Sequence, residues 1–215
     1  MSSPDTSFDP CLWVLKAAHE LFHIYQNAIL PKNLFQKQYV NNDDLNFPFN
    51  YKDESIAALG QIEAIFIFDK LKKKQWSVTD TIDIKRFFDQ DILLSKHVFP
   101  DSLQIFYKQL QEWKEGVARY TKRELACLTA DISYNPSASF LHQFKNNYKK
   151  VWEDNYDENN IFNPLRFVYK GVQGRVIFYY VGLVKAYLLE RFDSSWKKDY
   201  LTSDLDSLLI LKSTP

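Results

Sequence analysis

Two histidines separated by three residues form the strongest chemical motif of this sequence. The segment His19-Glu20-Leu21-Phe22-His23 has the pattern H-E-x-x-H. On a helix, residues four apart lie on one face, so both imidazoles can reach a single ion with Zn–N bonds of about 2.0–2.1 Å. Glu20 is rotated off that face, which suits a carboxylate that takes a proton from water. We therefore expect a Zn²⁺ site with His19 and His23 as ligands and Glu20 as the catalytic base.

This motif lies inside a well-defined predicted helix. Asp9 can cap the helix, Pro10 can take its first position, and Pro31 ends it. The apolar stripe of this helix also contains polar side chains, in the order Leu12, Leu15, His19, Phe22, Gln26 and Ile29. Unpaired imidazoles on a buried stripe are costly, which favours a metal site over two core histidines. We also expect Leu21 and Phe22 to pack inward.

A catalytic zinc needs a third protein ligand and one open position for water. Residues 115–120, with the sequence EGVARY, resemble the E-G-x-A-x-Y segment of gluzincin metallopeptidases, whose glutamate is the third ligand. Together, HELFHIYQ and EGVARY resemble zincin-like metallopeptidases. This resemblance implies that Glu115 binds the metal. Gly116 and Ala118 would in addition let two helices approach closely.

Periodicity leaves a different third ligand open. If residues 100–131 form one straight helix, its apolar stripe faces away from Glu115, which then lies on a solvated side beside Lys108 and Arg119. Glu63, by contrast, belongs to a predicted helix over residues 53–72 that is apolar nearly all round. A carboxylate there is expensive unless a charge or a metal compensates it. Glu63 is therefore the alternative third ligand.

Further helices are predicted near residues 80–95 and over 171–191, with shorter ones after Asp193 and Asp204. Residues 32–52 are predicted to be a long polar loop that borders a substrate cleft. Strand signals are few. The expected fold is mainly α: a single zincin-like domain over residues 1–215, with the active-site helix near the N-terminus and little or no β-sheet.

The predicted helix over residues 171–191 carries one more site candidate. Its segment from Arg175 to Gly182 resembles a Tyr-x-x-Gly segment found late in zincin-like families. The resemblance implies that Tyr180 hydrogen-bonds a developing oxyanion, as a tyrosine does in zinc peptidases. The alternative is that Tyr180 is a core aromatic residue.

Composition narrows the class of partner. Lys plus Arg equals Asp plus Glu at 27 each, so no net charge attracts a nucleic acid. The chain has only 5 Gly residues and no phosphate-binding loop. We find neither a signal sequence nor an apolar run that could span a bilayer, so we expect a cytoplasmic protein without membrane insertion. Its oligomeric state stays open.

These features predict a zinc-dependent hydrolase, a metallopeptidase acting on a peptide or protein substrate. The alternative is a zinc-binding but catalytically inactive zincin-like protein, either a relic or truncated before an upstream β-sheet lobe. Zincins place a sheet before the active helix, and its edge strand lines the substrate, whereas only 18 residues precede His19 here. A third possibility, a helical interaction module with a chance motif, predicts that no metal is bound.

Overall fold

A computed structural model describes residues 9–29, 47, 49, 53–99, 101–131, 133, 145–155 and 175–214. Within these ranges every regular element is a helix and no strand occurs, which confirms the predicted mainly α class. The helices, in chain order, are α1 (Pro10–Ile29), α2 (Glu54–Lys72), α3 (Val78–Val98), α4 (Ser102–Gln111), the π-helix η3 (Glu112–Gly116), α5 (Val117–Ala130), α6 (Lys145–Asn155), α9 (Val176–Phe192), α10 (Trp196–Asp199) and α11 (Leu205–Lys212). None of them is both long and apolar enough to cross a lipid bilayer. The predicted loop over residues 32–52 lies outside the described residues, except for Phe47 and Phe49.

Local sequence signals place the starts of α1 and α2 where the sequence predicts them, whereas α9 begins at Val176 and not near residue 171. The Asp9 carboxylate accepts a hydrogen bond of 2.8 Å from the backbone N–H of Cys11, at the first turn of α1. Asp53 caps α2 in the same way, through the N–H of Ser55 at 2.8 Å. Helix α6 was not predicted, because its sequence is strongly polar and only Tyr148 and Val151 are buried among the side chains described there.

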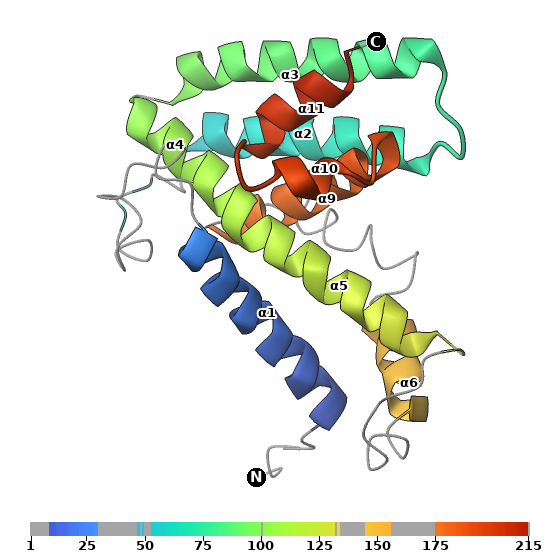
Figure 1. Cartoon of the computed structure of the whole chain (residues 1–215). Helices are drawn as coiled ribbons and strands as arrows, with labels where there is room; N and C mark the ends of the chain where they lie inside the picture. The colour runs from blue at the N-terminus through green and yellow to red at the C-terminus, as the bar shows by residue number, and fades with distance from the viewer. Residues whose placement is uncertain are drawn as a thin grey trace, which may run out of the picture.

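Helices α4 and α5 are joined through η3 into one long element, which crosses the molecule diagonally in Figure 1. The helix predicted over residues 100–131 is therefore present, but the condition that it is straight and regular fails at η3. Gly116 of η3 packs directly on Gly182 of α9, and a Cβ atom at Gly182 would come within 2.8 Å of the Glu112 backbone. The close approach predicted for Gly116 is thus confirmed, with α9 as the partner helix.

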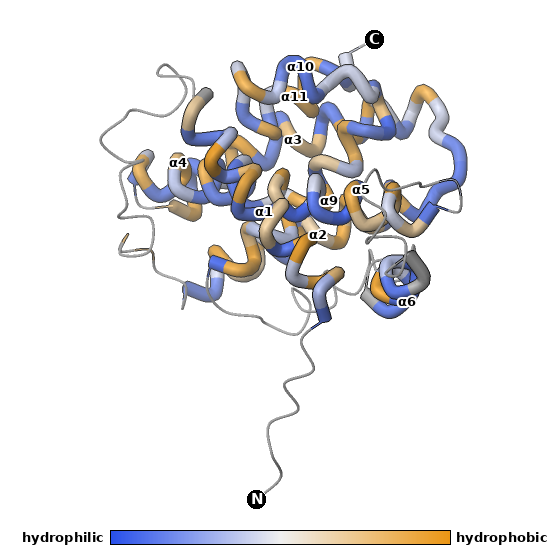
Figure 2. The backbone as a smooth tube through the Cα atoms, turned by 60° about the horizontal axis from the view of Figure 1, so that its bottom comes forward, coloured by the Kyte–Doolittle hydropathy of each residue, from blue (hydrophilic) through white to orange (hydrophobic). Residues whose placement is uncertain are grey.

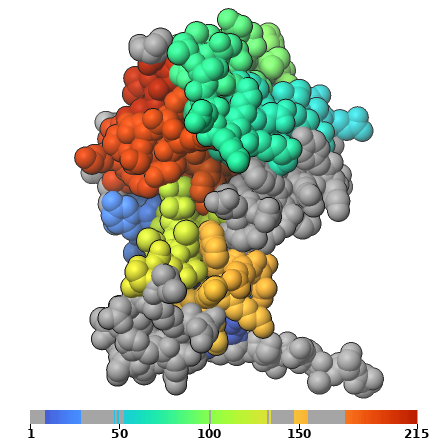
Figure 3. Space-filling view, turned by 90° about the vertical axis from the view of Figure 1, so that its right-hand side faces the viewer, coloured from blue at the N-terminus to red at the C-terminus, as the bar shows by residue number. Residues whose placement is uncertain are grey.

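The long element separates two packing regions. Helices α2, α3, α9 and α11 pack around its α4 and η3 part and enclose the main core, whereas α1 and α6 pack against α5 (Figure 1). Figure 2 shows hydrophobic and hydrophilic residues alternating along most helices, as amphipathic helices require. In Figure 3 the helices of the main core form one rounded mass, and α6 lies below it against α5. A small second cluster joins α1, α5 and α6 through Cys11, Leu15, Ala126, Tyr148 and Val151.

A set of six ionisable side chains lies inside the main core. The Lys185 ammonium contacts the carboxylates of Asp206 at 2.6 Å, Glu112 at 2.7 Å and Glu63 at 3.0 Å. The Lys108 ammonium lies 2.7 Å from Glu63. Each of the six is at most 3% exposed. We call them the buried charge network: Glu63, Asp91, Lys108, Glu112, Lys185 and Asp206.

This network explains why Glu63 is buried. A carboxylate that is 0% exposed does need compensation, as the sequence indicated, but two lysines supply it. Glu63, Glu112 and Asp206 could by spacing hold a cation together, yet the Lys185 ammonium is bound to all three. Glu63 lies in the main core and belongs to a different group of side chains from His19 and His23.

The network also predicts a pH dependence of stability. Burial and nearby carboxylates raise the pKa of Asp91 to about 8 and that of Glu112 to about 7. The folded chain then binds protons that the unfolded chain releases near pH 4, so the free energy of unfolding falls as pH rises from about 4 to 8. We expect Asp91→Asn, which mimics the protonated acid, to flatten this fall in urea unfolding measured at several pH values. Asp89→Asn, on the exposed side of α3, is the control, and an equal slope in both variants would contradict the prediction.

Candidate metal centre

Three side chains converge between α1 and η3. The Nε2 atoms of His19 and His23 lie 3.1 Å apart, and Oε2 of Glu115 lies 3.6 Å from the first and 3.5 Å from the second. In a tetrahedral zinc site with bonds of about 2.1 Å, ligand atoms are separated by about 3.4 Å. Two imidazoles and one carboxylate at this spacing fit a zinc ion bound between them.

The π-helix decides where Glu115 points. Residues three apart on a regular α-helix share a face, but in η3 they do not. Glu112 faces α9 and pairs with Lys185, while Glu115 faces α1 and the two histidines. The alternative that placed Glu115 in solvent beside Lys108 is wrong, because the Glu115 side chain is 18% exposed and Lys108 is buried.

Gln26 orients one of the two imidazoles. Its Oε1 atom, which can only accept, lies 2.7 Å from Nδ1 of His23, so Nδ1 carries the proton and Nε2 keeps its lone pair for a metal. The Gln26 amide donates to the backbone oxygen of Lys114 at 2.8 Å and of Trp113 at 3.3 Å, and also to the Tyr200 hydroxyl. Gln26 therefore ties the His23 ring to the same η3 segment that carries Glu115. His19 is held less firmly, since its Nδ1 has no hydrogen-bond partner within the described part of the chain.

The role of Gln26 was not predicted from the sequence. The available signal was its position on the apolar stripe, three residues after His23, where a polar side chain needs partners. Gln26 is 0% exposed in the structure, which confirms that the stripe faces the protein interior at this point.

The neighbouring side chains affect the ionisation of Glu115 and His23. Burial disfavours the charged form of Glu115, but the two adjacent imidazoles hold the pKa of its carboxyl well below the usual range. Burial likewise disfavours a charged His23, but the neighbouring Glu115 and Gln26 raise the pKa of its imidazole. Both shifts favour a negative Glu115 carboxylate beside a protonated His23. A metal competes with that proton, so zinc affinity should weaken as pH falls.

Glu20 lies on the solvent-exposed side of α1, one residue from His19. No hydrogen bond or ion pair engages it among the described residues, so its carboxylate is free to contact water. Leu21, predicted to pack inward, is 64% exposed, because the buried face of α1 is narrower than its apolar sequence suggests. Phe22 is half-buried and packs against the main core as predicted.

Aromatic and basic side chains surround Glu115 on its α9 side. Burial raises the pKa of Tyr179 and the Glu115 carboxylate adds to the rise, whereas Arg175 and Arg119 oppose it. The Arg119 guanidinium lies 5.2 Å from the ring centroid of Tyr179 and 5.0 Å from that of Tyr180. The structure thus places Tyr180 beside Arg119, and its predicted oxyanion role stays a prediction.

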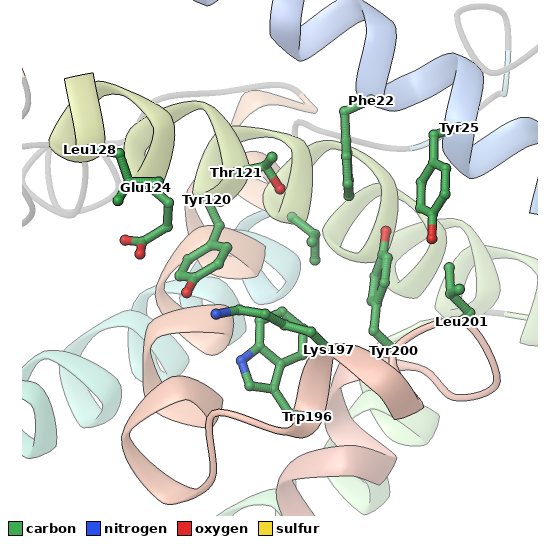
Figure 4. A pocket seen from close by; sticks show the side chains of 11 residues that line it. Phe22, Tyr25, Tyr120, Thr121, Glu124, Leu128, Trp196, Lys197, Tyr200 and Leu201 are labelled. Carbon is green, nitrogen blue, oxygen red and sulfur yellow. The ribbon is translucent and has the colours of Figure 1, made fainter. Parts of the chain in front are cut away.

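A pocket of about 380 Å³ lies between α1, α5 and α10, and none of the three converging side chains lines it. Figure 4 shows Phe22 and Tyr25 of α1 facing Tyr200 across this space. Tyr200 also binds Gln26 through its hydroxyl, so the pocket wall is one hydrogen bond away from the residue that orients His23. The lining residues are Phe22, Tyr25, Val117, Tyr120, Thr121, Glu124, Leu128, Trp196, Lys197, Tyr200 and Leu201.

No family model, curated protein sequence or solved structure matches this chain. Its function is therefore inferred from the geometry and chemistry of its own residues.

Replacing Gln26 with alanine should weaken zinc binding. The His23 ring loses the acceptor at its Nδ1, and loss of such an outer partner typically lowers metal affinity about 10- to 100-fold. A competition titration with a zinc chelator measures the effect. Asn27→Ala, on the exposed side of α1, is the matched control. Equal zinc affinities of the two variants would show that Gln26 does not position His23.

Proposed function

We propose that this chain is a zinc-dependent hydrolase, a metallopeptidase whose zinc ligands are His19, His23 and Glu115. The observation that carries the proposal is the convergence of the three ligand atoms at a surface that water can reach. The side chains are 15%, 13% and 18% exposed, respectively, so a fourth coordination position stays open. The resemblance of the two segments HELFHIYQ and EGVARY to zincin-like metallopeptidases supports the same set of ligands.

Zinc at such a site supplies Lewis acidity toward a substrate carbonyl and toward water. The residues of the chain do the rest. Glu20 takes the proton of the attacking water and returns it to the leaving amine. Gln26 keeps the His23 ring in the tautomer that leaves Nε2 free. Glu115 contributes a negative charge, because its pKa lies well below the usual range, and this charge favours the binding of a divalent cation.

A second function, zinc binding without peptide cleavage, is favoured by one observation. No strand occurs within the described ranges, so no sheet edge there is available to pair with an extended substrate. In that case the same three ligands hold zinc, and Glu20 has no substrate to act on.

Metal content and activity together test the proposal. We expect about one zinc per chain by elemental analysis and cleavage of a quenched-fluorescence peptide library. Glu20→Gln should keep the zinc and lower kcat about 10²- to 10⁴-fold, the usual contribution of a general base. Glu153→Gln, an exposed glutamate of α6, should change neither. Stoichiometric zinc without cleavage in the wild type would support the second function, and absence of zinc would refute both.

A further inference from the structure

Two arginines lie beside Tyr179, close to Glu115, and have no acidic partner within the described residues. Arg119 follows Glu115 by four residues in the long helix, and Arg175 precedes α9. Both guanidinium groups lie over the Tyr179 ring, at 5.2 Å for Arg119 and 5.7 Å for Arg175. Such stacking holds a guanidinium in a fixed plane while its N–H groups stay available.

The charges of these arginines are not neutralised within the described part of the chain. No carboxylate there lies within ion-pair distance of either one, and the Nε atom of Arg119 is buried without a hydrogen-bond acceptor. A buried N–H donor without a partner costs free energy, which an anionic ligand would recover. The planar fork of an arginine matches a carboxylate in two parallel hydrogen bonds.

The distance from Glu115 to Arg119 fits the terminal residue of a peptide. Along the helix axis, four residues rise by about 6 Å at about 1.5 Å per residue, and Glu115 and Arg119 both lie close to Tyr179. One extended residue of a substrate spans about 3.3–3.6 Å. A peptide bond held at the three zinc ligands therefore places a carboxylate one or two residues further along near Arg119. Binding of the C-terminal carboxylate would also hold a substrate in place without β-strand pairing, for which the described helices offer no sheet edge.

We propose that Arg119 and Arg175 bind the C-terminal carboxylate of a short peptide, so that the chain removes residues from the C-terminal end. This inference rests on the proposed zinc peptidase function. It makes the two arginines specificity residues of the His19–His23–Glu115 site.

Binding to a chain that cannot turn over substrate tests the inference. Zinc-loaded Glu20→Gln protein is titrated by calorimetry with N-acetyl-tetraalanine, once as the free acid and once as the C-terminal amide. We expect the free acid to bind at least about tenfold more tightly, the factor for one charge-assisted hydrogen bond. Adding Arg119→Met or Arg175→Met should remove this preference with the zinc content unchanged. Arg119→Lys should restore part of it, and Arg86→Met, on the exposed side of α3, should leave it intact.

Three other results would contradict either the role of the two arginines or the proposed zinc peptidase function. Equal affinity for acid and amide, with zinc bound and end-blocked peptides cleaved by the wild type, overturns the arginine role and leaves the proposed function standing. Inorganic phosphate that binds more tightly than the free acid also overturns it, in favour of a phosphate ligand. If the wild type binds no zinc, the proposed function fails, and with it the role of the arginines in substrate choice.

Discussion

Replacing Glu115 with alanine is expected to abolish tight zinc binding while the chain still folds. The Glu115 carboxylate is the only acid within 4 Å of the two Nε2 atoms among the described residues, and it pairs with no lysine or arginine there. Its loss removes one of three ligands and the negative charge of the site. Loss of a residue that only hydrogen-bonds a metal ligand typically lowers metal affinity about 10- to 100-fold. We expect a larger fall in zinc affinity for Glu115→Ala, and competition with a chelator measures it.

The alternative ligand provides the control for this experiment. Glu63→Gln removes a charge from the buried charge network and should lower stability, but each folded chain should keep its zinc. The reverse result, with zinc lost in Glu63→Gln and kept in Glu115→Ala, would show that the ligand set is wrong. Circular dichroism of both variants separates loss of metal from loss of fold.

Lys185→Met should be the most destabilising single change in the main core. Its ammonium is 0% exposed and contacts three carboxylates, those of Glu63, Glu112 and Asp206, at 3.0, 2.7 and 2.6 Å. Methionine fills a similar volume but leaves these acids without their shared partner. Breaking a buried ion pair on one side typically costs about 3–5 kcal/mol of unfolding free energy. Urea unfolding at neutral pH measures it.

A matched lysine on the surface gives the control. Lys197 forms an ion pair of 2.8 Å with Glu190, but the Lys197 side chain is 49% exposed. Exposed pairs contribute about 0–1 kcal/mol, so Lys197→Met should be close to neutral. Similar losses in the two variants would mean that the core tolerates unpaired acids. Part of the loss in Lys185→Met should be recovered at acidic pH, where those acids become protonated.

The two predictions concern opposite sides of the same short segment. Within η3, Glu112 belongs to the buried charge network and Glu115 to the metal centre. Packing of Gly116 on Gly182 fixes this segment against α9, where an added methyl group would meet the main chain. The stability of the core and the position of Glu115, the proposed third zinc ligand, therefore depend on the same helix contact.

The sequence by itself determined most of the helices, the starts of α1 and α2, and the pair of histidines. These features depend on neighbours in the chain: caps such as Asp9 and Asp53 bond to N–H groups two or three residues away, and the spacing of His19 and His23 brings their side chains together on any α-helix. Helix α6 escaped prediction because it has few apolar residues of its own and is held by contacts with α1 and α5.

Only the tertiary structure decided between Glu115 and Glu63 as the neighbour of the histidines. The periodicity argument assumes a regular α-helix, but residues 112–116, which include Glu115, form a π-helix. Burial alone marks Glu63 as a residue that needs a compensating charge, but it does not say whether the charge is a lysine or a metal. In the structure the compensating charges are Lys108 and Lys185, which lie 45 and 122 residues from Glu63 in sequence. Contacts over such separations depend on tertiary packing and leave no local pattern in the sequence.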